Sequence, residues 1–404
     1  MTRGGSVLDV VNLDLGTALR EAQAAPESIP DIMMRVAKPL GATDLAVYLV
    51  DFAQTSLQPM PDCAPHAAVS IPEEVIGTMA GRAFITGCVV TTARPGGVRV
   101  WAPITEGSDR TGVIALTVDD WNDTLDNACI ELGLLAGYLI ATQARTTDLY
   151  NLHRRRRALS LAASMQWDLL PPLILKTPTV TVAGMLEPAY DVGGDYFDYA
   201  LNNGILNIAI VDVMGHGVAS AMISALVAGS YRHDRREGQP LEKIHAHLDD
   251  VVERHWPKLA FATGQLAQLD ITSGALTWTN AGHPLPLLVR GGRVVGELQC
   301  RPTVPWGISS ITETAADVMV ANEMLEPGDG VLFYTDGVIE AHEPGEEMFG
   351  TERLEDLANR HASDQLEPEE IVRLIVRSVL EYRIDALDDD ATLLLVRWSG
   401  PTPV

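Results

Sequence analysis

The segment Ile208–Gly217, IAIVDVMGHG, is the most informative guide to the fold of the C-terminal half of the chain. Its apolar run is typical of a buried strand, and it leads directly into Asp212. A Gly-His-Gly turn and a segment of small residues with helical character follow. This pattern places a carboxylate at a rigid strand end, beside a turn whose glycines let the backbone approach closely.

Three further segments repeat this pattern. Asp195 follows two glycines in AYDVGGDYFD (189–198), Asp336 ends the strand of VLFYTDG (331–337), and Asp388–Asp390 precede the strand LLLV. A single Asp of this kind is usually a turn former or a helix N-cap. Several at strand ends are better explained by convergence on one point, where their mutual repulsion is removed by a divalent cation.

The ligand types indicate which cation the site takes. The strand-end candidates are all aspartates, and oxygen donors of this kind favour Mg²⁺ or Mn²⁺ over Zn²⁺. The backbone carbonyl of Val213, next to Asp212, is positioned to complete a coordination shell. Spacing alone therefore predicts an acidic, hard-metal site with hydrolytic chemistry in an α+β domain.

The sequence around this site, from Thr179 to Trp398, contains many short β-rich runs punctuated by Gly and Asp. Helical stretches are expected at Ala219–Tyr231, Leu241–His255 and Pro368–Tyr382. Clustered strands with helices between them, rather than strict βαβ alternation, indicate an α+β fold with mostly antiparallel sheets.

The preceding segment, Leu125–Leu170, has the composition of one long helix that ends before Pro171-Pro172. Its imperfect leucine seam is suited to parallel pairing in a dimer. The basic run His153–Arg157 is interpreted as a solvated helix face, because the net charge of the chain disfavours a nucleic-acid role.

The region up to Asp120 mixes helical and strand patterns. A helix is predicted over Ile29–Leu40 and a strand over Asp44–Val50. The runs Val98–Ile104 and Thr111–Val118 flank a polar turn and are predicted to be adjacent antiparallel strands. The region is consistent with a compact α+β domain.

Composition limits the classes of function. The 404 residues include 29 Lys and Arg against 54 Asp and Glu, a net charge of −25, which disfavours nucleic-acid or anionic-membrane binding. The N-terminus lacks the apolar core of a signal peptide, and the run Leu132–Ala141 is too short to cross a bilayer, so we expect a soluble, cytoplasmic protein. Reduced thiols are expected at four scattered positions: Cys63, Cys88, Cys129 and Cys300.

Six blocks in order resemble the bacterial metal-dependent serine/threonine protein phosphatases of the RsbU/SpoIIE-like group, which are related to type 2C phosphatases. The blocks are VGGDYFD (192–198), DVMGHGVASAM (212–222), NAGHPLP (280–286), LEPGDGVLFYTDGVIEA (325–341), FG (349–350) and DDAT (389–392). The resemblance covers roughly Thr179–Trp398. It implies an antiparallel β-sandwich flanked by helices, with two Mg²⁺ or Mn²⁺ ions in an acidic cleft.

Carried over block by block, the resemblance implies a role for each acid. Asp195 and Asp212 match metal-binding acids, with Asp212 as the bridging ligand beside the Val213 carbonyl. Asp336 and Asp389 match the acids that complete the shell of the second metal, and Asp390 matches a residue behind the ligands or a ligand of a weakly held third metal. The metals would activate a water to attack phosphoserine or phosphothreonine in line, without a protein nucleophile.

Further expectations concern the roles of two histidines and the way in which the phosphate group of the substrate is bound. His216 is either a general acid or a hydrogen-bonding partner of its loop, with the structural role favoured, and contact between His283 and the substrate stays open. No motif places an Arg for phosphate binding, so affinity for small phosphate esters should be poor.

The first region resembles a GAF domain, without a specific block. Cys88 or Cys129 could attach a chromophore or sense redox state, but a buried structural cysteine is favoured. The predicted organisation is a GAF-like sensor at 1–124, a dimerising helical linker at 125–172 and a phosphatase domain at 173–400. A small-molecule or protein signal would act through the linker on dephosphorylation of a STAS-type anti-sigma factor antagonist.

Two alternatives stay open beside the phosphatase. One is a catalytically silent sensor or scaffold that binds phosphoproteins, which the presence of all four acids disfavours. The other is a two-metal phosphodiesterase, a class that typically uses His-rich ligand sets, whereas the candidate ligands here are aspartates.

Overall fold

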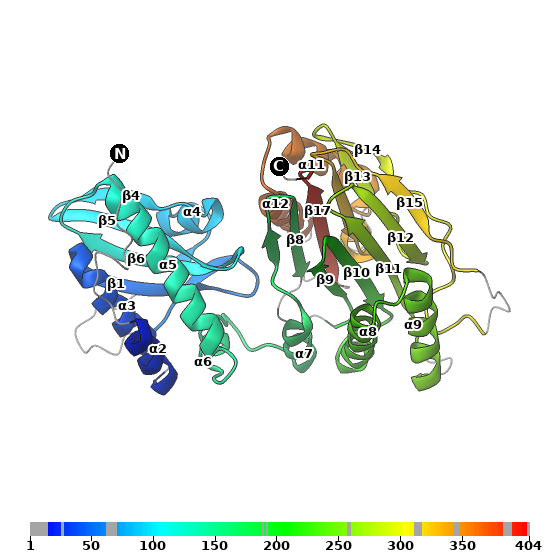
Figure 1. Cartoon of the computed structure of the whole chain (residues 1–404), viewed down its shortest axis with the longest axis horizontal. Helices are drawn as coiled ribbons and strands as arrows, with labels where there is room; N and C mark the ends of the chain where they lie inside the picture. Colours follow the sequence, from blue (N-terminus) through cyan, green and yellow to red (C-terminus); the bar gives the residue numbers. More distant parts are fainter. Residues whose placement is uncertain are drawn as a thin grey trace. The chain divides into compact units, whose positions relative to one another are not determined.

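The computed structural model describes residues 15–25, 28–61, 71–187, 190, 193–256, 260–310, 317–342, 347–382 and 390–401. The chain divides into two compact units, Met1–Ala158 and Leu159–Val404 (Figure 1). Predicted Asp389 and Cys63 lie outside the described residues.

The N-terminal unit contains a six-stranded antiparallel sheet in the order β3-β2-β1-β6-β5-β4. Its strands are β1 (Ala42–Val50), β2 (Ser56–Pro59), β3 (Glu73–Glu74), β4 (Val90–Arg94), β5 (Gly97–Glu106) and β6 (Asp109–Val118). Its helices are α2 (Leu15–Ala24), α3 (Ile29–Ala37), the 3₁₀ turn η2 (Lys38–Leu40), α4 (Met79–Thr86), α5 (Asp123–Gln143) and α6 (Leu149–His153). The predicted pair of adjacent strands is confirmed as β5 and β6.

The central strands β1, β5 and β6 are buried on both faces of the sheet, with side chains alternating between the faces along each strand. On β1, Val47 and Leu49 join a core formed with α2, α3 and α5. Tyr48 and Val50 join a second core formed with α4 on the other face. The unit is therefore a three-layer α+β domain, as expected from its mixed pattern.

The prediction of one long helix over Leu125–Leu170 is wrong. Three helices occupy the segment: α5, α6 and, in the second unit, α7 (Leu161–Leu169). An added Cβ on Gly133 or Gly137 would lie 2.0 Å from the carbonyl oxygen of Pro103 or Thr105, so these glycines let α5 lie directly on β5. Tertiary packing thus incorporates α5 into the N-terminal core.

The basic run His153–Arg157 also differs from its prediction as a solvated helix face. Helix α6 ends at His153, so the arginines lie beyond it. Arg154 donates from Nε to the carbonyl oxygen of Val50 at 2.8 Å, and its guanidinium stacks on Phe52. This side chain ties the end of the N-terminal unit back onto its own sheet.

Helix α5 is, within the described part of the chain, the one helix long and apolar enough to cross a membrane by length and composition. One face of it is packed into the core, including Cys129, where burial raises the thiol pKa to about 12. The structural interpretation is thus supported for Cys129, whereas Cys88 is exposed, so it does not fit a buried structural role.

The C-terminal unit contains two antiparallel sheets, in the orders β15-β12-β11-β10-β9 and β14-β13-β16-β17-β8-β7 (Figure 1). The strands are β7 (Ile174–Lys176), β8 (Val180–Glu187), β9 (Tyr196–Asn202), β10 (Ile205–Val213), β11 (Ala262–Asp270), β12 (Ala275–Ala281), β13 (Leu287–Arg290), β14 (Arg293–Glu297), β15 (Ala321–Met324), β16 (Gly330–Tyr334) and β17 (Ala391–Trp398). The helices besides α7 are α8 (Val218–Arg236), α9 (Leu241–His255), α10 (Asp336–Ile339), α11 (Gly350–Ser363) and α12 (Pro368–Glu381). The predicted antiparallel α+β class is confirmed.

Three large hydrophobic cores lie in the described part of this unit. One combines residues of both sheets, such as Ile208 and Trp278 with Phe333 and Leu394. The outer face of the β10 sheet packs on α8 and α9, and the outer face of the β16 sheet packs on α11 and α12. The predicted helices correspond to α8, α9 and α12, but α11 was not predicted, because its mostly polar sequence buries only a narrow stripe that includes Leu354 and Ala358.

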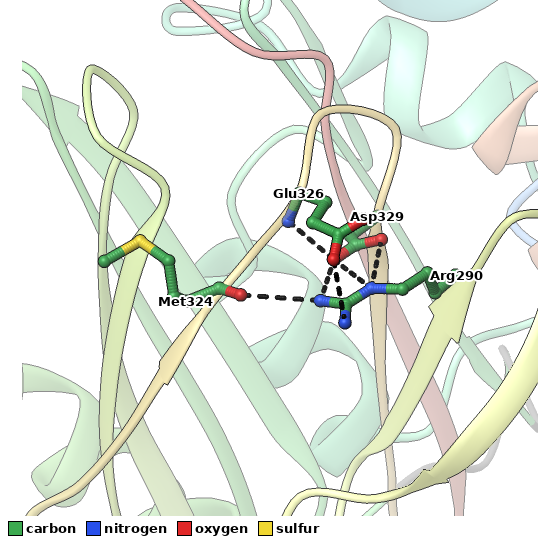
Figure 2. Close-up of polar contacts among 4 residues, drawn as sticks. All are labelled: Arg290, Met324, Glu326 and Asp329. Atoms are coloured by element: carbon green, nitrogen blue, oxygen red, sulfur yellow. Dashed lines mark hydrogen bonds and ion pairs between the residues drawn. The ribbon is translucent and has the colours of Figure 1, made fainter.

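An acid of the 325–341 block has a structural role, at the opposite end of β16 from Asp336. Asp329 is buried, and both of its carboxylate oxygens accept hydrogen bonds from the Arg290 guanidinium at 2.6–3.1 Å (Figure 2). The backbone N–H of Glu326 donates to the same carboxylate, and Arg290 donates to the carbonyl oxygen of Met324. This ion pair joins β13 to the turn that opens β16.

Helix α9 carries a buried histidine that predicts acid sensitivity. His245 lies between the hydroxyls of Thr279 and Thr303, 3.1 and 2.9 Å from its ring nitrogens, and burial lowers its pKa from 6.5 to about 4. As the pH falls, His245 is protonated in the unfolded chain before it is protonated in the folded protein. Its contribution to the free energy of unfolding is therefore complete above pH 6.5 and is lost as the pH falls toward 4. The loss from this residue is about 3 kcal/mol.

We expect the free energy of unfolding to fall between pH 7 and pH 4.5 more steeply in the wild type than in His245→Gln, which cannot titrate. Urea denaturation at both pH values measures the difference. Equal pH dependence in the two proteins would show that His245 contributes nothing to acid sensitivity.

Candidate metal-binding active site

The acids of the predicted site come from neighbouring strand ends in both sheets. In the first sheet, Asp195 precedes β9 and Asp212 lies near the end of β10, and these strands pair with Val211 opposite Tyr196. In the second sheet, Asp336 follows β16 and Asp390 precedes β17, and these strands pair with Tyr334 opposite Leu393. Antiparallel pairing thus brings one strand's end beside its partner's beginning.

Asp195 joins the ends of the two sheets. Its Oδ2 accepts hydrogen bonds from Thr335 Oγ1 at 2.7 Å and Thr392 Oγ1 at 2.6 Å, and both threonines belong to the second sheet's strand ends. Thr392 N–H also donates to Thr335 Oγ1 at 2.9 Å. The carboxylate is therefore fixed in direction by two hydroxyls that are themselves held together.

Burial and neighbouring negative charge determine the electrostatics of Asp195. The side chain is buried, and desolvation, followed by the charges of Asp212 and Asp390, raises its pKa well above 3.8. Asp336 is close enough to Asp212 to share a hydrogen bond, and its pKa is raised by burial and by Glu340. The structure thus brings Asp195, Asp212 and Asp336 into one electrostatic cluster.

Asp390 has a different role from the other acids. Its Oδ2 accepts hydrogen bonds from three consecutive backbone N–H groups, those of Gly193 at 2.7 Å, Gly194 at 2.6 Å and Asp195 at 3.3 Å. This oxygen is committed to holding the Gly-Gly-Asp loop. These contacts favour a role for Asp390 in supporting the metal ligands, rather than as a metal ligand itself.

The glycines of the site are required by close backbone contacts. Val213 is buried at the end of β10, and a Cβ added to Gly194 would lie 2.5 Å from its carbonyl oxygen. A Cβ added to Gly193 would lie 2.3 Å from the backbone nitrogen of Gly217. The Gly-Gly-Asp loop and the turn after Asp212 therefore pack backbone to backbone.

The two histidines are placed differently. His216 is exposed in the turn, between Gly215 and Gly217 at φ of 87° and 82°. His283 is buried, its Nδ1 lies 2.9 Å from Thr263 Oγ1, and burial lowers its pKa to about 3. Its imidazole is thus neutral at pH 7, and Asn280 closes the surrounding turn by hydrogen bonds to the His283 backbone. These contacts indicate a structural role for the NAGH motif.

The donor types of the site determine which cation it would suit. In the described part of the chain, no three Asp, Glu, His or Cys side chains have an arrangement that could hold a metal ion by themselves. The approach of Asp195, Asp212 and Asp336 nevertheless concentrates desolvated oxygen donors and negative charge, which fits a hard divalent cation rather than a soft one. The residues that would hold it are these three with the Val213 carbonyl, while Asp389 lies outside the described residues.

The polar residues that hold this cluster were not predicted from the sequence. Thr335 and Thr392 orient Asp195, and the buried hydroxyls of Ser220 and Ser224 contact the carbonyls of the Gly-Gly-Asp loop. A signal was available for the threonines, because each lies within two residues of a predicted acid in the TDG and DDAT blocks. Nothing in the sequence marked the two serines, because small residues in a helix are usually explained by close helix packing.

Comparison with known proteins shows that the C-terminal region is similar to bacterial phosphatases. Residues 202–399 match the SpoIIE family, described as Stage II sporulation protein E. The phosphoserine phosphatase RsbU of Bacillus subtilis is 25% identical over 266 residues, covering 65% of this chain and 77% of RsbU. Protein IcfG of Synechocystis is 24% identical over 269 residues, covering 60% of this chain and 41% of IcfG.

Further similarity extends to a third curated protein and to a solved structure. The phosphoserine phosphatase RsbP of Bacillus subtilis is 25% identical over 191 residues, covering 46% of each chain. The solved SiaA-PP2C domain of Pseudomonas aeruginosa is 22% identical, with a TM-score of 0.49, and the match covers 58% of this chain and 94% of that domain. The chain thus spans less than half of IcfG and of RsbP.

Proposed function

We propose that the C-terminal unit, a serine/threonine phosphatase of the SpoIIE and RsbU type, hydrolyses phosphoserine or phosphothreonine on a bacterial signalling protein. The enzyme class rests on the match of residues 202–399 and on the two relatives named phosphoserine phosphatase. The observation that carries the proposal for this chain is the meeting of Asp195, Asp212 and Asp336 where the ends of two sheets are joined by Thr335 and Thr392.

The acids would hold Mg²⁺ or Mn²⁺, with Asp389 as a further ligand. When bound, a pair of such ions supplies a water activated at neutral pH and neutralises charge on the phosphoryl group. The protein's own contribution is orientation. Thr335 and Thr392 fix the Asp195 carboxylate, and the buried position of Asp195 keeps bulk water from screening its charge.

We propose a small phosphorylated protein of the STAS type as the substrate and the N-terminal unit as a GAF-like sensor that controls the reaction. The names of RsbU and RsbP support phosphoserine as the group that is hydrolysed. The three-layer N-terminal unit, with a sheet core separate from that of the phosphatase unit, supports a regulatory role.

The proposed activity is tested by release of phosphate from a phosphoserine-bearing STAS-type protein. With the full chain, we expect turnover in Mn²⁺ and none in excess EDTA, with restoration on adding Mn²⁺ back. p-Nitrophenyl phosphate should be a poor substrate, because no motif supplies an arginine for its phosphate. Turnover that survives EDTA would contradict the mechanism, and Mn²⁺ binding without turnover would identify the protein as a catalytically silent binder.

We also propose a homodimer formed through α5. Ile130, Leu134 and Tyr138 lie four residues apart on this helix and are 37%, 46% and 59% exposed. Such a stripe can pair with a second copy of itself. Light scattering of the full chain should give a dimer mass, and Leu134→Glu with Tyr138→Glu should give a monomer. Val295→Glu, at an exposed valine of the other unit, is the control, and a monomeric wild type would exclude the dimer.

A further inference from the structure

Helix α8 has two buried hydroxyls on the side that faces the Gly-Gly-Asp loop. Ser220 and Ser224 are 2% and 1% exposed, whereas Met222 between them is 52% exposed. Ser224 Oγ donates to the carbonyl oxygen of Gly194, and Ser220 Oγ lies 2.7 Å from that of Gly193. Serine is not a strong helix former, and a buried hydroxyl is costly without a partner, so these positions are matched to the loop.

The two serines differ in how fully they are committed to the loop. Ser220 Oγ also lies 2.9 Å from the carbonyl oxygen of Gly217, the N-cap residue of α8, so it shares its single proton between two acceptors. Ser224 has the Gly194 carbonyl as its acceptor. Ser224 is therefore the cleaner position at which to test the contact.

The same loop is held from its other side by Asp390. The Asp390 carboxylate accepts from the N–H groups of residues 193, 194 and 195, while the serines donate to the carbonyls of residues 193 and 194. The loop forms no strand or helix at these positions, so side chains satisfy its backbone groups in place of a ladder. We call this arrangement the loop clamp: Ser220, Ser224 and Asp390.

The loop clamp acts on the position of Asp195. Asp195 and Asp212 repel each other when both are ionised, so keeping the two carboxylates side by side without a cation costs free energy. A loop fixed on both sides keeps the carboxylates together in the absence of a cation, so less free energy is needed to assemble the site on binding. A similar effect is general around metal ligands, where the groups that orient them affect metal affinity about 10–100-fold.

We infer that Ser220 and Ser224 are positioning residues which, through the loop clamp, set the affinity of the acidic site for its divalent cation. The inference rests on the proposed metal-dependent function of that site. The serines act through the loop backbone and are not themselves ligands.

The test is Mn²⁺ binding to the full chain by isothermal titration calorimetry. We expect Ser224→Ala to weaken Mn²⁺ binding about tenfold and the double variant Ser220→Ala/Ser224→Ala to weaken it further. Turnover of the phosphoprotein by these variants should fall at low Mn²⁺ and recover at saturating Mn²⁺, which a generally damaged fold would not do. Ser230→Ala, at a half-buried serine further along α8, should bind Mn²⁺ as the wild type does.

A second variant keeps the test decisive if the alanine variants fold poorly. Ser224→Thr retains the hydroxyl, so it should bind Mn²⁺ within about threefold of the wild type, and thermal unfolding in EDTA checks that each variant is folded. Wild-type Mn²⁺ affinity in the double variant would overturn the inference, as would binding by Ser224→Thr as weak as that by Ser224→Ala. If the wild type binds Mn²⁺ but releases no phosphate, only the proposed function fails. If the wild type binds no Mn²⁺, both fail.

Discussion

Replacing Asp212 with asparagine is expected to lower kcat/KM on a phosphoserine protein at least about a hundredfold. Asp212 is close to both Asp195 and Asp336, so the substitution removes the charge shared by the two halves of the site. Asparagine keeps the size of the side chain and removes a like charge beside a buried carboxylate, so the metal-free protein should lose no stability. Mn²⁺-dependent phosphate release with the full chain measures the effect.

The matched control is Asp270→Asn, which changes another aspartate at a strand end in the same sheet. Asp270 ends β11 and accepts hydrogen bonds from Thr272, a local turn contact that asparagine can also make. This variant should retain wild-type turnover. Near-wild-type activity in Asp212→Asn, or equal losses in the two variants, would contradict the assignment of the site.

Removing the Arg290 side chain should give the largest loss of stability. In Arg290→Ala, the Asp329 carboxylate, whose side chain is 2% exposed, loses its bidentate partner (Figure 2). Leaving a buried charge unpaired costs about 3 kcal/mol. The midpoint of the urea transition of the C-terminal unit, followed by tryptophan fluorescence, should fall accordingly.

Two further variants distinguish the cost of leaving Asp329 buried without a partner from the cost of losing an exposed ion pair. Arg377 pairs with Glu381 on α12 with side chains 46% and 61% exposed, so Arg377→Ala should cost only about 0.5 kcal/mol. Asp329→Asn with Arg290→Met removes both charges and should be less destabilising than Arg290→Ala alone. Equal losses in Arg290→Ala and Arg377→Ala would show that burial of Asp329 does not govern the stability of this turn.

Local pattern was sufficient to predict much of the C-terminal unit. The apolar runs before Asp212 and Asp336 form strands β10 and β16, and helices α8, α9 and α12 lie where the periodicity placed them. These features are encoded by neighbouring residues, because a buried strand or an amphipathic helix is specified by its own sequence. The acids at the strand ends were identifiable for the same reason.

Contacts between distant residues were not predictable in this way. The Leu125–Leu170 segment has helical composition throughout, yet α5 ends at Gln143 and is packed on β5 through Gly133 and Gly137. Likewise, Asp329 and Asp336 both lie at ends of β16, and only the partner supplied by β13 makes Asp329 structural.

Local sequence was enough to identify the strand-end acids, the antiparallel α+β class and the family to which the chain is similar. Which acids meet, and what holds them, is visible only in the folded chain. Asp195 is oriented by Thr335 and Thr392, about 140 and 197 positions away, and its loop is held by Asp390 and two serines of α8. A hydrogen bond depends on distance in space and not along the chain, so its partners appear only when the two sheets are in place.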